Sequence, residues 1–170
     1  FDVWYDGFKA RGQSNPQELD RIVSSKYPSI ESFQRDLPTI LRKLGFAPEK
    51  ADFLAARIQV DPARGAGHAM GAAMREDKAH LRTRASGGLN YKGYNIAIHE
   101  LGHTVEQVFS LNEMDYYMLN GVPNTAFTEA FAFVFQDRDL QLLGLQAGND
   151  ERRTAMKALD TFWGTYEIGG

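Results

Sequence analysis

Two histidines stand four residues apart near the middle of this chain of 170 residues, in the segment His99-Glu-Leu-Gly-His103. Because side chains four apart share one face of an α-helix, His99 and His103 can reach a single metal ion if the segment is helical. Glu100 is offset from them, so its carboxylate can meet a water molecule bound to that metal. This His-Glu-x-x-His pattern is typical of zinc-dependent hydrolases and predicts a catalytic zinc centre.

A catalytic zinc ion usually takes three protein ligands and keeps its fourth position for water, so a third ligand is expected elsewhere in the chain. The chain has no cysteine, which limits that ligand to His, Asp or Glu. Glu129 is the best candidate, because it lies in a stretch rich in phenylalanine, where burying an unpaired carboxylate would be costly. The sequence therefore predicts zinc bound by His99, His103 and Glu129. Glu100 would act as the general base that takes a proton from the activated water and passes it to the leaving amine.

Helices must position these residues, and the spacing of apolar side chains, prolines and glycines predicts where they lie. Pro38 should kink or split the third of them. The expected helices cover 2–11, 16–26, 30–44, a stretch from Ala47 to the Asp61-Pro62 pair, and then 94–110, 125–136, 137–143 and 150–164.

The region 63–93 has a different character, because glycines interrupt any helical periodicity. Polar and apolar side chains alternate from Lys78 to Ala85, which is typical of a half-buried strand. Residues 65–74 are a plausible partner, so we expect a small antiparallel β ribbon directly before the zinc helix. The whole chain, 1–170, is expected to form one mainly α catalytic core.

Composition excludes several classes of function. Hydrophobic residues make up 43% of the chain, as in an ordinary globular protein. The net charge of −3 argues against nucleic acid as a partner, because the chain has no excess of Lys or Arg to bind phosphate groups. No segment approaches the roughly 20 apolar residues that cross a bilayer, so no membrane is expected as a partner. The chain begins with Phe1 and shows no signal peptide, so we expect a piece of a longer protein. The lack of cysteine is compatible with either the cytoplasm or the periplasm and does not choose between them.

The zinc motif and its surroundings resemble a known family, the gluzincin zinc metallopeptidases. The match is to the angiotensin-converting-enzyme-like and thimet-oligopeptidase-like groups, and it rests on His99-Glu-Leu-Gly-His103 followed by Gly121-Val-Pro-Asn-Thr-Ala-Phe-Thr-Glu129-Ala. Upstream, Gly67-His-Ala-Met-Gly71 and Lys78-Ala-His-Leu-Arg-Thr-Arg84 resemble the ribbon that precedes the zinc helix in the first group. The similarity runs from about residue 35 to about residue 145. It implies a zincin-like catalytic core that uses zinc to cleave peptides lying in a deep channel.

The resemblance also implies roles for residues in the ribbon. His68 falls where the family uses a histidine to hold a substrate carbonyl. The backbone of Ala69 and Met70 would offer a strand edge to an extended peptide, which is recognition by β-strand addition.

Two positions depart from the family pattern. Phe133 stands where the family often has an acidic residue that supports the metal site. The tyrosine and histidine that stabilise the oxyanion in the family lie further downstream than Gly170, and Tyr166 is the only late tyrosine here that could take that role. These departures keep two other functions open, a zinc-containing peptide-binding domain without turnover and a structural helical domain in which the motif is accidental.

Several polar residues near the motif have two interpretations. Glu106, one turn beyond His103, could orient a zinc ligand, as could Glu113 or Asp115, although an exposed acid is the simpler interpretation of Glu106. His80 is expected to be a solvated or cross-strand residue.

Overall fold

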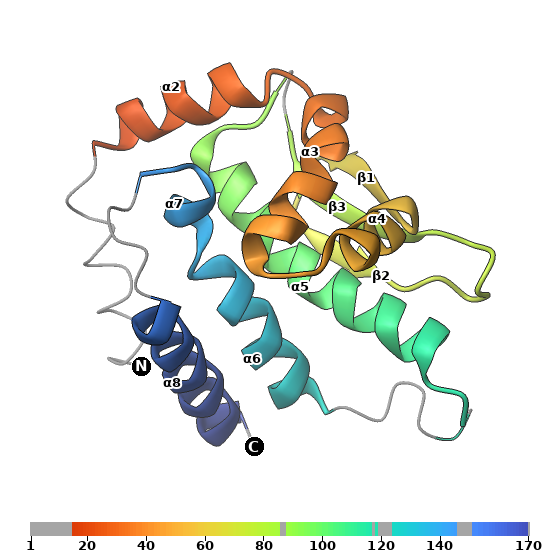
Figure 1. Ribbon diagram of the computed structural model, residues 1–170. Helices are drawn as coiled ribbons and strands as arrows, with labels where there is room; N and C mark the ends of the chain where they lie inside the picture. The colour runs from red at the N-terminus through yellow and green to blue at the C-terminus, as the bar shows by residue number, and fades with distance from the viewer. Residues whose placement is uncertain (1–14, 86–87, 117, 119–123, 146–150, 170) are drawn as a thin grey trace.

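A computed structural model of the chain describes residues 15–85, 88–116, 118, 124–145 and 151–169. The helix predicted over 2–11 lies outside these residues. The described part is mainly helical with one small sheet, and Figure 1 shows its elements in order. They are α2 (Pro16–Lys26), α3 (Ile30–Leu44), α4 (Pro48–Ala56), β1 (Ile58–Ala63), β2 (His68–Met70), β3 (Ala79–Arg84), α5 (Tyr91–Glu113), α6 (Thr125–Gln136), α7 (Asp139–Leu142) and α8 (Glu151–Gly169).

The first helices begin and end where their sequence signals predict. The Asn15 side chain accepts a hydrogen bond from the backbone N–H of Gln17, and a proline opens α2. At the end of α3, Gly45 adopts the left-handed conformation, with φ of 108°. Of the kink or split expected at Pro38, the split does not occur, since α3 continues through this residue as one element. The buried apolar face of α3 favours this continuity, because breaking the helix would expose it.

The predicted helix from Ala47 to the Asp61-Pro62 pair is wrong in its second half. The helix α4 ends at Ala56, and the next residues form the strand β1. Ile58 and Val60 are buried on the same side of this strand. The outer edge of β1 is paired by the Gln34 side chain of α3, which donates to Ile58 O at 3.0 Å and accepts from Val60 N at 2.6 Å. These tertiary bonds favour strand over helix, although the apolar residues here also fit helical spacing.

The sheet has three strands in the order β1-β3-β2, so it is larger than the two-stranded ribbon expected from the sequence. The prediction of antiparallel pairing is confirmed for β2 and β3, where Ala69 lies opposite Leu81. On the other side β1 runs parallel to β3, which makes the sheet mixed. The partner strand β2 is also shorter than the predicted stretch 65–74. The alternation predicted around β3 is confirmed, because Ala79, Leu81 and Thr83 are buried while the residues between them are exposed.

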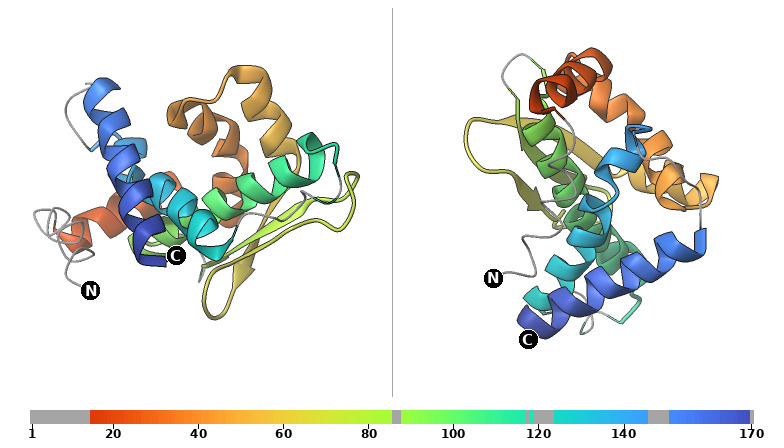
Figure 2. Two further views of the ribbon diagram at one scale, coloured as in Figure 1. Left: turned by 90° about the horizontal axis from the view of Figure 1, so that it is seen from below. Right: turned by 90° about the vertical axis from the view of Figure 1, so that its left-hand side faces the viewer.

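The long helix α5 runs through the middle of the molecule. Figures 1 and 2 show the sheet against one side of it and α6 against the other. It begins at Tyr91, three residues earlier than predicted, because Asn90 caps it by accepting a hydrogen bond from Gly93 N at 2.9 Å. The Thr83 hydroxyl of β3 donates to Gly93 O at 2.7 Å and ties the sheet to the start of this helix. The buried core joins α5 to the sheet and to the N-terminal helices, and its fully buried side chains include Phe33, Leu37, Leu54, Ile58, Leu81, Tyr94, Ile98 and Leu101.

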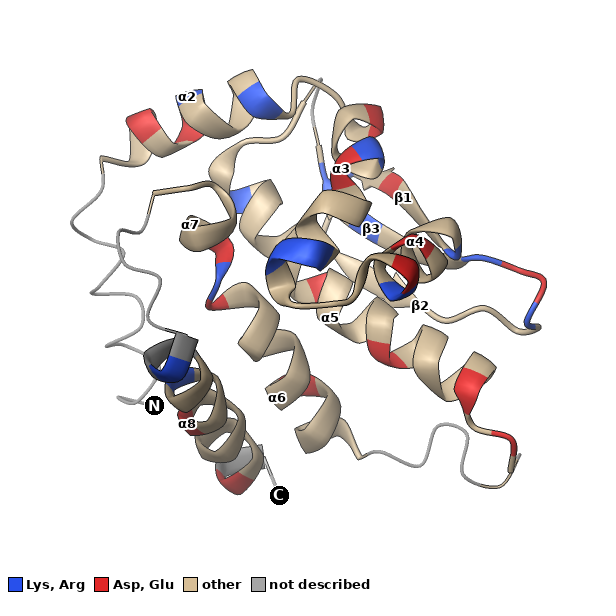
Figure 3. Cartoon of the chain, viewed as in Figure 1, with Lys and Arg blue, Asp and Glu red and all other residues tan. Residues whose placement is uncertain are grey.

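The helix α6 has the bounds that the sequence predicts. Figure 3 shows it uncharged except at one acidic position, and Glu129 is the only charged residue in its sequence. It packs between α5 and α8, where Phe127 meets Phe162 with ring centroids 5.3 Å apart. Among the described residues, no helix is both long and apolar enough to cross a membrane.

Candidate metal centre

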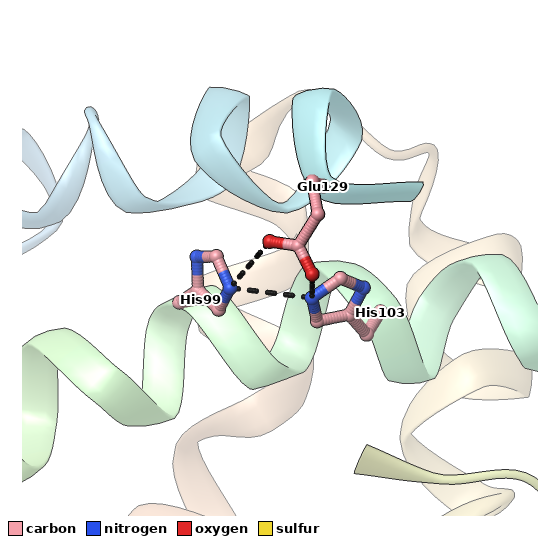
Figure 4. Close-up of side chains that lie close together, drawn as sticks. All are labelled: His99, His103 and Glu129. Atoms are coloured by element: carbon pink, nitrogen blue, oxygen red, sulfur yellow. Dashed lines mark hydrogen bonds and ion pairs between the residues drawn. The ribbon is translucent and has the colours of Figure 1, made fainter. Parts of the chain in front are cut away.

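The structure brings together the three residues predicted to bind zinc. His99 and His103 point from adjacent turns of α5 toward Glu129 on α6 (Figure 4). The two Nε2 atoms lie 3.2 Å apart. One carboxylate oxygen of Glu129 lies 3.4 Å from His99 Nε2, and the other lies 3.4 Å from His103 Nε2. The three side chains therefore converge on one small space between the two helices.

The two histidine nitrogens have the spacing of ligands on one tetrahedral zinc ion. Zinc–nitrogen and zinc–oxygen bonds of about 2.0–2.1 Å at tetrahedral angles place neighbouring ligand atoms roughly 3.3 Å apart. The 3.2 Å between the two Nε2 atoms agrees with that value. Each Nε2 atom also lies 3.4 Å from a different oxygen of Glu129, so the carboxylate faces the same space as the two nitrogens. Among the described residues, His99, His103 and Glu129 form the one group of three or more His, Asp or Glu side chains whose ligand atoms gather closely enough to hold a metal. Two imidazoles and one carboxylate are also a donor set that zinc accepts.

A close contact between helix backbones makes this convergence possible. A Cβ atom built on Gly102 would stand 2.6 Å from the Cα atom of Ala132, so only glycine allows α5 to approach α6 this closely. The helix α6 occupies the space that the absent side chain of Gly102 leaves. Glu129 lies about one turn before Ala132 on α6 and is thereby held against the histidines.

Glu129 is less buried than its place among phenylalanines in the sequence suggests. Its side chain is 41% exposed, whereas those of His99 and His103 are 16% and 15% exposed. The phenylalanines around it point elsewhere, because Phe135 enters the core and Phe127 packs against α8. The carboxylate therefore lines an open side of the site, and the cost of burial is not what places it there.

Two side-chain amides connect the Nδ1 atom of His99 to a buried acid by successive hydrogen bonds. His99 Nδ1 lies 3.0 Å from Gln136 Oε1, and Gln136 Nε2 donates to Asn95 Oδ1 at 2.6 Å. Asn95 Nδ2 in turn donates to Asp139 Oδ2 at 2.5 Å. These supporting residues were not predicted from the sequence. The only signal was the position of Gln136 seven residues, two helical turns, after Glu129, which puts both on one face of α6.

Phe133 also contacts the site, although it cannot replace a hydrogen-bonding acid. Its ring meets that of His99 edge-on, with centroids 4.8 Å apart. Position 133 thus contributes packing, and the hydrogen bond to His99 comes from Gln136 one turn further along α6.

The acids proposed as alternative supports for the histidines are engaged elsewhere. Glu106 accepts a hydrogen bond from the Ser110 hydroxyl at 2.7 Å. Glu113, at the far end of α5, pairs with Lys50. Asp115 is almost fully exposed, and its carboxylate lies 3.9 Å from the Arg75 guanidinium.

Electrostatics favour a neutral imidazole at His103. Partial burial lowers its pKa, the nearby Glu129 carboxylate opposes this shift, and His99 adds to it. A neutral imidazole has a lone pair free for a metal, so the direction of the shift suits a ligand.

Glu100 lies beside the metal ligands and against the edge strand β2. Burial raises the pKa of its carboxyl group, while the neighbouring His99 and His68 lower it and Glu129 raises it further. The backbone of Ala69 lies near the carboxylate and lowers this pKa slightly. Gly67 allows this approach, because a Cβ there would stand 3.2 Å from Glu100 Cγ.

The remaining candidates are placed as follows. His68 is exposed on β2, Ala69 is half-buried, and Met70 is 49% exposed. His80 behaves as the cross-strand residue that was expected, since its Nδ1 lies 2.6 Å from Asp61 Oδ2 on β1. Tyr166 stacks on Phe162 and lies beside Trp163 within α8.

Comparison of the chain with protein-family models, with curated proteins and with solved structures finds no match.

Proposed function

We propose that this chain is the catalytic core of a zinc-dependent peptidase of the gluzincin type. The observation that carries the proposal is the convergence of His99, His103 and Glu129, whose ligand atoms lie within 4.8 Å of one another, with Glu100 directly beside them. An accidental motif on a surface helix would not require a third ligand from another helix at matching distances.

When bound, zinc would supply Lewis acidity, lowering the pKa of a coordinated water and polarising a substrate carbonyl. His99 and His103 would hold it through Nε2, and Glu129 through its carboxylate. Glu100 would accept a proton from the attacking water and deliver it to the leaving amine. Its partial burial supports this role, because a raised pKa makes the carboxylate a stronger base.

The substrate is proposed to be an extended peptide. The strand β2 is the outer strand of the sheet, with β3 on only one side of it. Ala69 on this strand lies near Glu100, so a peptide added along the outer edge of β2 would place its backbone beside the proposed general base. His68 is exposed on β2 and close enough to Glu100 to influence its pKa, and it would donate a hydrogen bond to a carbonyl of that peptide.

The test is Glu100→Gln, because glutamine keeps the shape of glutamate and cannot act as the base. We expect the wild-type chain and the variant to bind one zinc ion each by elemental analysis. Only the wild-type chain should cleave unstructured peptides. Cleavage by the purified variant at the wild-type rate would overturn the role of Glu100. Zinc and peptide binding without turnover in the wild-type chain would instead favour the peptide-binding domain, and failure to bind zinc would favour an accidental motif.

A further inference from the structure

Four side chains from three helices form a continuous line of hydrogen bonds that ends at a buried acid. The line runs from His99 through Gln136 and Asn95 to Asp139, with successive distances of 3.0, 2.6 and 2.5 Å. Asp139 opens the short helix α7 and is 1% exposed. It is therefore shielded from water, and two amide side chains connect it to His99.

The direction of every hydrogen bond in this line follows from its last member. A carboxylate only accepts hydrogen bonds, so Asn95 must turn its NH₂ group toward Asp139 and its carbonyl toward Gln136. Gln136 must then donate its NH₂ group to Asn95, which leaves Oε1 facing His99. Because Oε1 can only accept, the proton of His99 must be on Nδ1.

The opposite direction would be incompatible with metal binding. If the two amides reversed, the NH₂ group of Gln136 would donate to His99 Nδ1. A neutral His99 would then carry its proton on Nε2, the atom that faces Glu129 and His103. That tautomer offers no lone pair to a metal at Nε2.

Asp139 is held firmly enough to impose this direction. Its carboxylate accepts hydrogen bonds from the Tyr91 hydroxyl at 2.7 Å and from the backbone N–H of Leu140 at 2.6 Å. The Tyr94 hydroxyl donates to its backbone carbonyl at 3.1 Å. Since the group is buried, water cannot easily replace a partner that turns away.

We propose that Asp139 is a positioning residue that fixes His99 as its Nδ1–H tautomer through the amides of Asn95 and Gln136. The consequence for zinc affinity rests on the proposed metal centre, whereas the tautomer itself can be observed without any metal.

The first measurement is a long-range ¹H–¹⁵N correlation spectrum of the imidazole nitrogens in the metal-free protein, at a pH where the imidazoles are neutral. His99 should carry its proton on Nδ1 in the wild-type chain. In Asp139→Asn the hydrogen bonds along Asn95 and Gln136 can take either direction, so the His99 proton should move partly to Nε2. Gln136→Leu should have the same effect, because it removes the acceptor altogether. An unchanged His99 tautomer in both variants would overturn the proposal.

The second measurement is zinc affinity by chelator competition, in a double-mutant cycle that combines Asp139→Asn with Gln136→Glu. A carboxylate at position 136 accepts from His99 Nδ1–H whatever stands at position 139, and an asparagine at position 139 can then donate toward Asn95. Asp139→Asn alone should weaken zinc binding about tenfold to a hundredfold. Added to Gln136→Glu, it should cause little or no further loss. If Asp139→Asn reduces zinc affinity equally with and without Gln136→Glu, Asp139 acts only through folding and the proposal is overturned.

Tyr94→Phe is the matched control, because it removes a hydrogen bond to the backbone of Asp139 and leaves its carboxylate untouched. We expect it to leave the His99 tautomer and the zinc affinity unchanged. The two hypotheses can fail separately. If the variants shift the His99 tautomer but the protein binds no zinc, the proposed function is contradicted and this inference is supported. If the protein binds zinc tightly but the variants leave the His99 tautomer unchanged, the proposed metal centre is supported and this inference is contradicted.

Discussion

Gly102 of α5 and Ala132 of α6 approach so closely that a Cβ atom on the glycine would lie 2.6 Å from the alanine Cα. The contact is between backbones, so a flexible side chain cannot move aside to relieve it. It sets the separation of the two helices that together supply the metal ligands. The stability of the fold and the geometry of the site therefore depend on the same contact.

Gly102→Ala should lower the free energy of unfolding by about 1–3 kcal/mol, because the added methyl forces α5 and α6 apart. Helix propensity alone would predict the opposite, a gain of up to about 1 kcal/mol. Urea denaturation distinguishes the two signs. Gly164→Ala in α8 is the control, since no atom lies within 4 Å of the added Cβ there, and it should stabilise the protein. A stabilised Gly102→Ala variant would contradict the close contact.

Glu129→Ala should greatly weaken zinc binding without preventing folding. The side chain is partly exposed, so its removal leaves no buried cavity, but it takes away the only ligand from α6. Zinc at 100 times its Kd should stabilise the wild-type chain by about 2.7 kcal/mol and the variant by much less, which thermal unfolding with and without zinc measures. Glu106→Gln on α5 is the control and should respond to zinc as the wild-type chain does.

The elements of the fold that depend on local signals were predictable from the sequence. The ends of α2, α3 and α6 follow from caps, prolines and glycine, whose effects act within one turn. The strand β1 was missed because Ile58 continues the helical spacing of the apolar residues in α4. Its pairing with β3 and with Gln34 comes from residues more than 20 positions away, which no local pattern reveals.

The residues of the candidate site likewise fall into those that local sequence predicts and those that depend on distant contacts. His99, Glu100 and His103 lie within one helical segment, so their geometry follows from helix periodicity alone. Glu129 was inferred from the need for a third ligand, although the burial expected of it was wrong. The line from Gln136 through Asn95 to Asp139 joins α5, α6 and α7, and amides are too common in sequences to mark it.

His68→Ala should reduce kcat/KM for peptide cleavage by about tenfold and leave zinc content unchanged. The side chain is exposed on the edge strand, so it serves no packing role, and its expected contribution is one hydrogen bond to a substrate carbonyl, worth about 1.5 kcal/mol. Steady-state kinetics with an unstructured peptide measures the effect. His80→Ala is the control, because His80 lies on the middle strand β3 and its side chain contacts Asp61 of β1, away from the outer edge of β2. Equal losses in the two variants would point to a general effect of histidine removal on the sheet.

Stability should fall steeply at alkaline pH because of two buried tyrosines. Tyr27 is 1% exposed and donates to Asp36 Oδ2 at 2.6 Å, and Tyr94 is fully buried against it with ring centroids 5.7 Å apart. Burial raises the pKa of both hydroxyls well above the ordinary range, and the Asp36 carboxylate raises that of Tyr27 further. The folded state therefore keeps protons that the unfolded state loses above about pH 10, so stability is complete below that pH and decreases as pH rises.

Because each tyrosine loses its proton only in the unfolded state, each should make the free energy of unfolding fall by about 1.4 kcal/mol per pH unit above pH ~10. Urea denaturation between pH ~9 and pH ~11 measures the slope. Tyr27→Phe loses the hydrogen bond to Asp36 and should be less stable at neutral pH. Above pH ~10 its free energy of unfolding should fall less steeply with pH, by the contribution of one proton. The exposed Tyr116 offers the matched control, and Tyr116→Phe should keep the wild-type slope. A Tyr27→Phe slope equal to that of the wild-type chain would mean that Tyr27 ionises as readily in the folded protein as in the unfolded one, contrary to its burial.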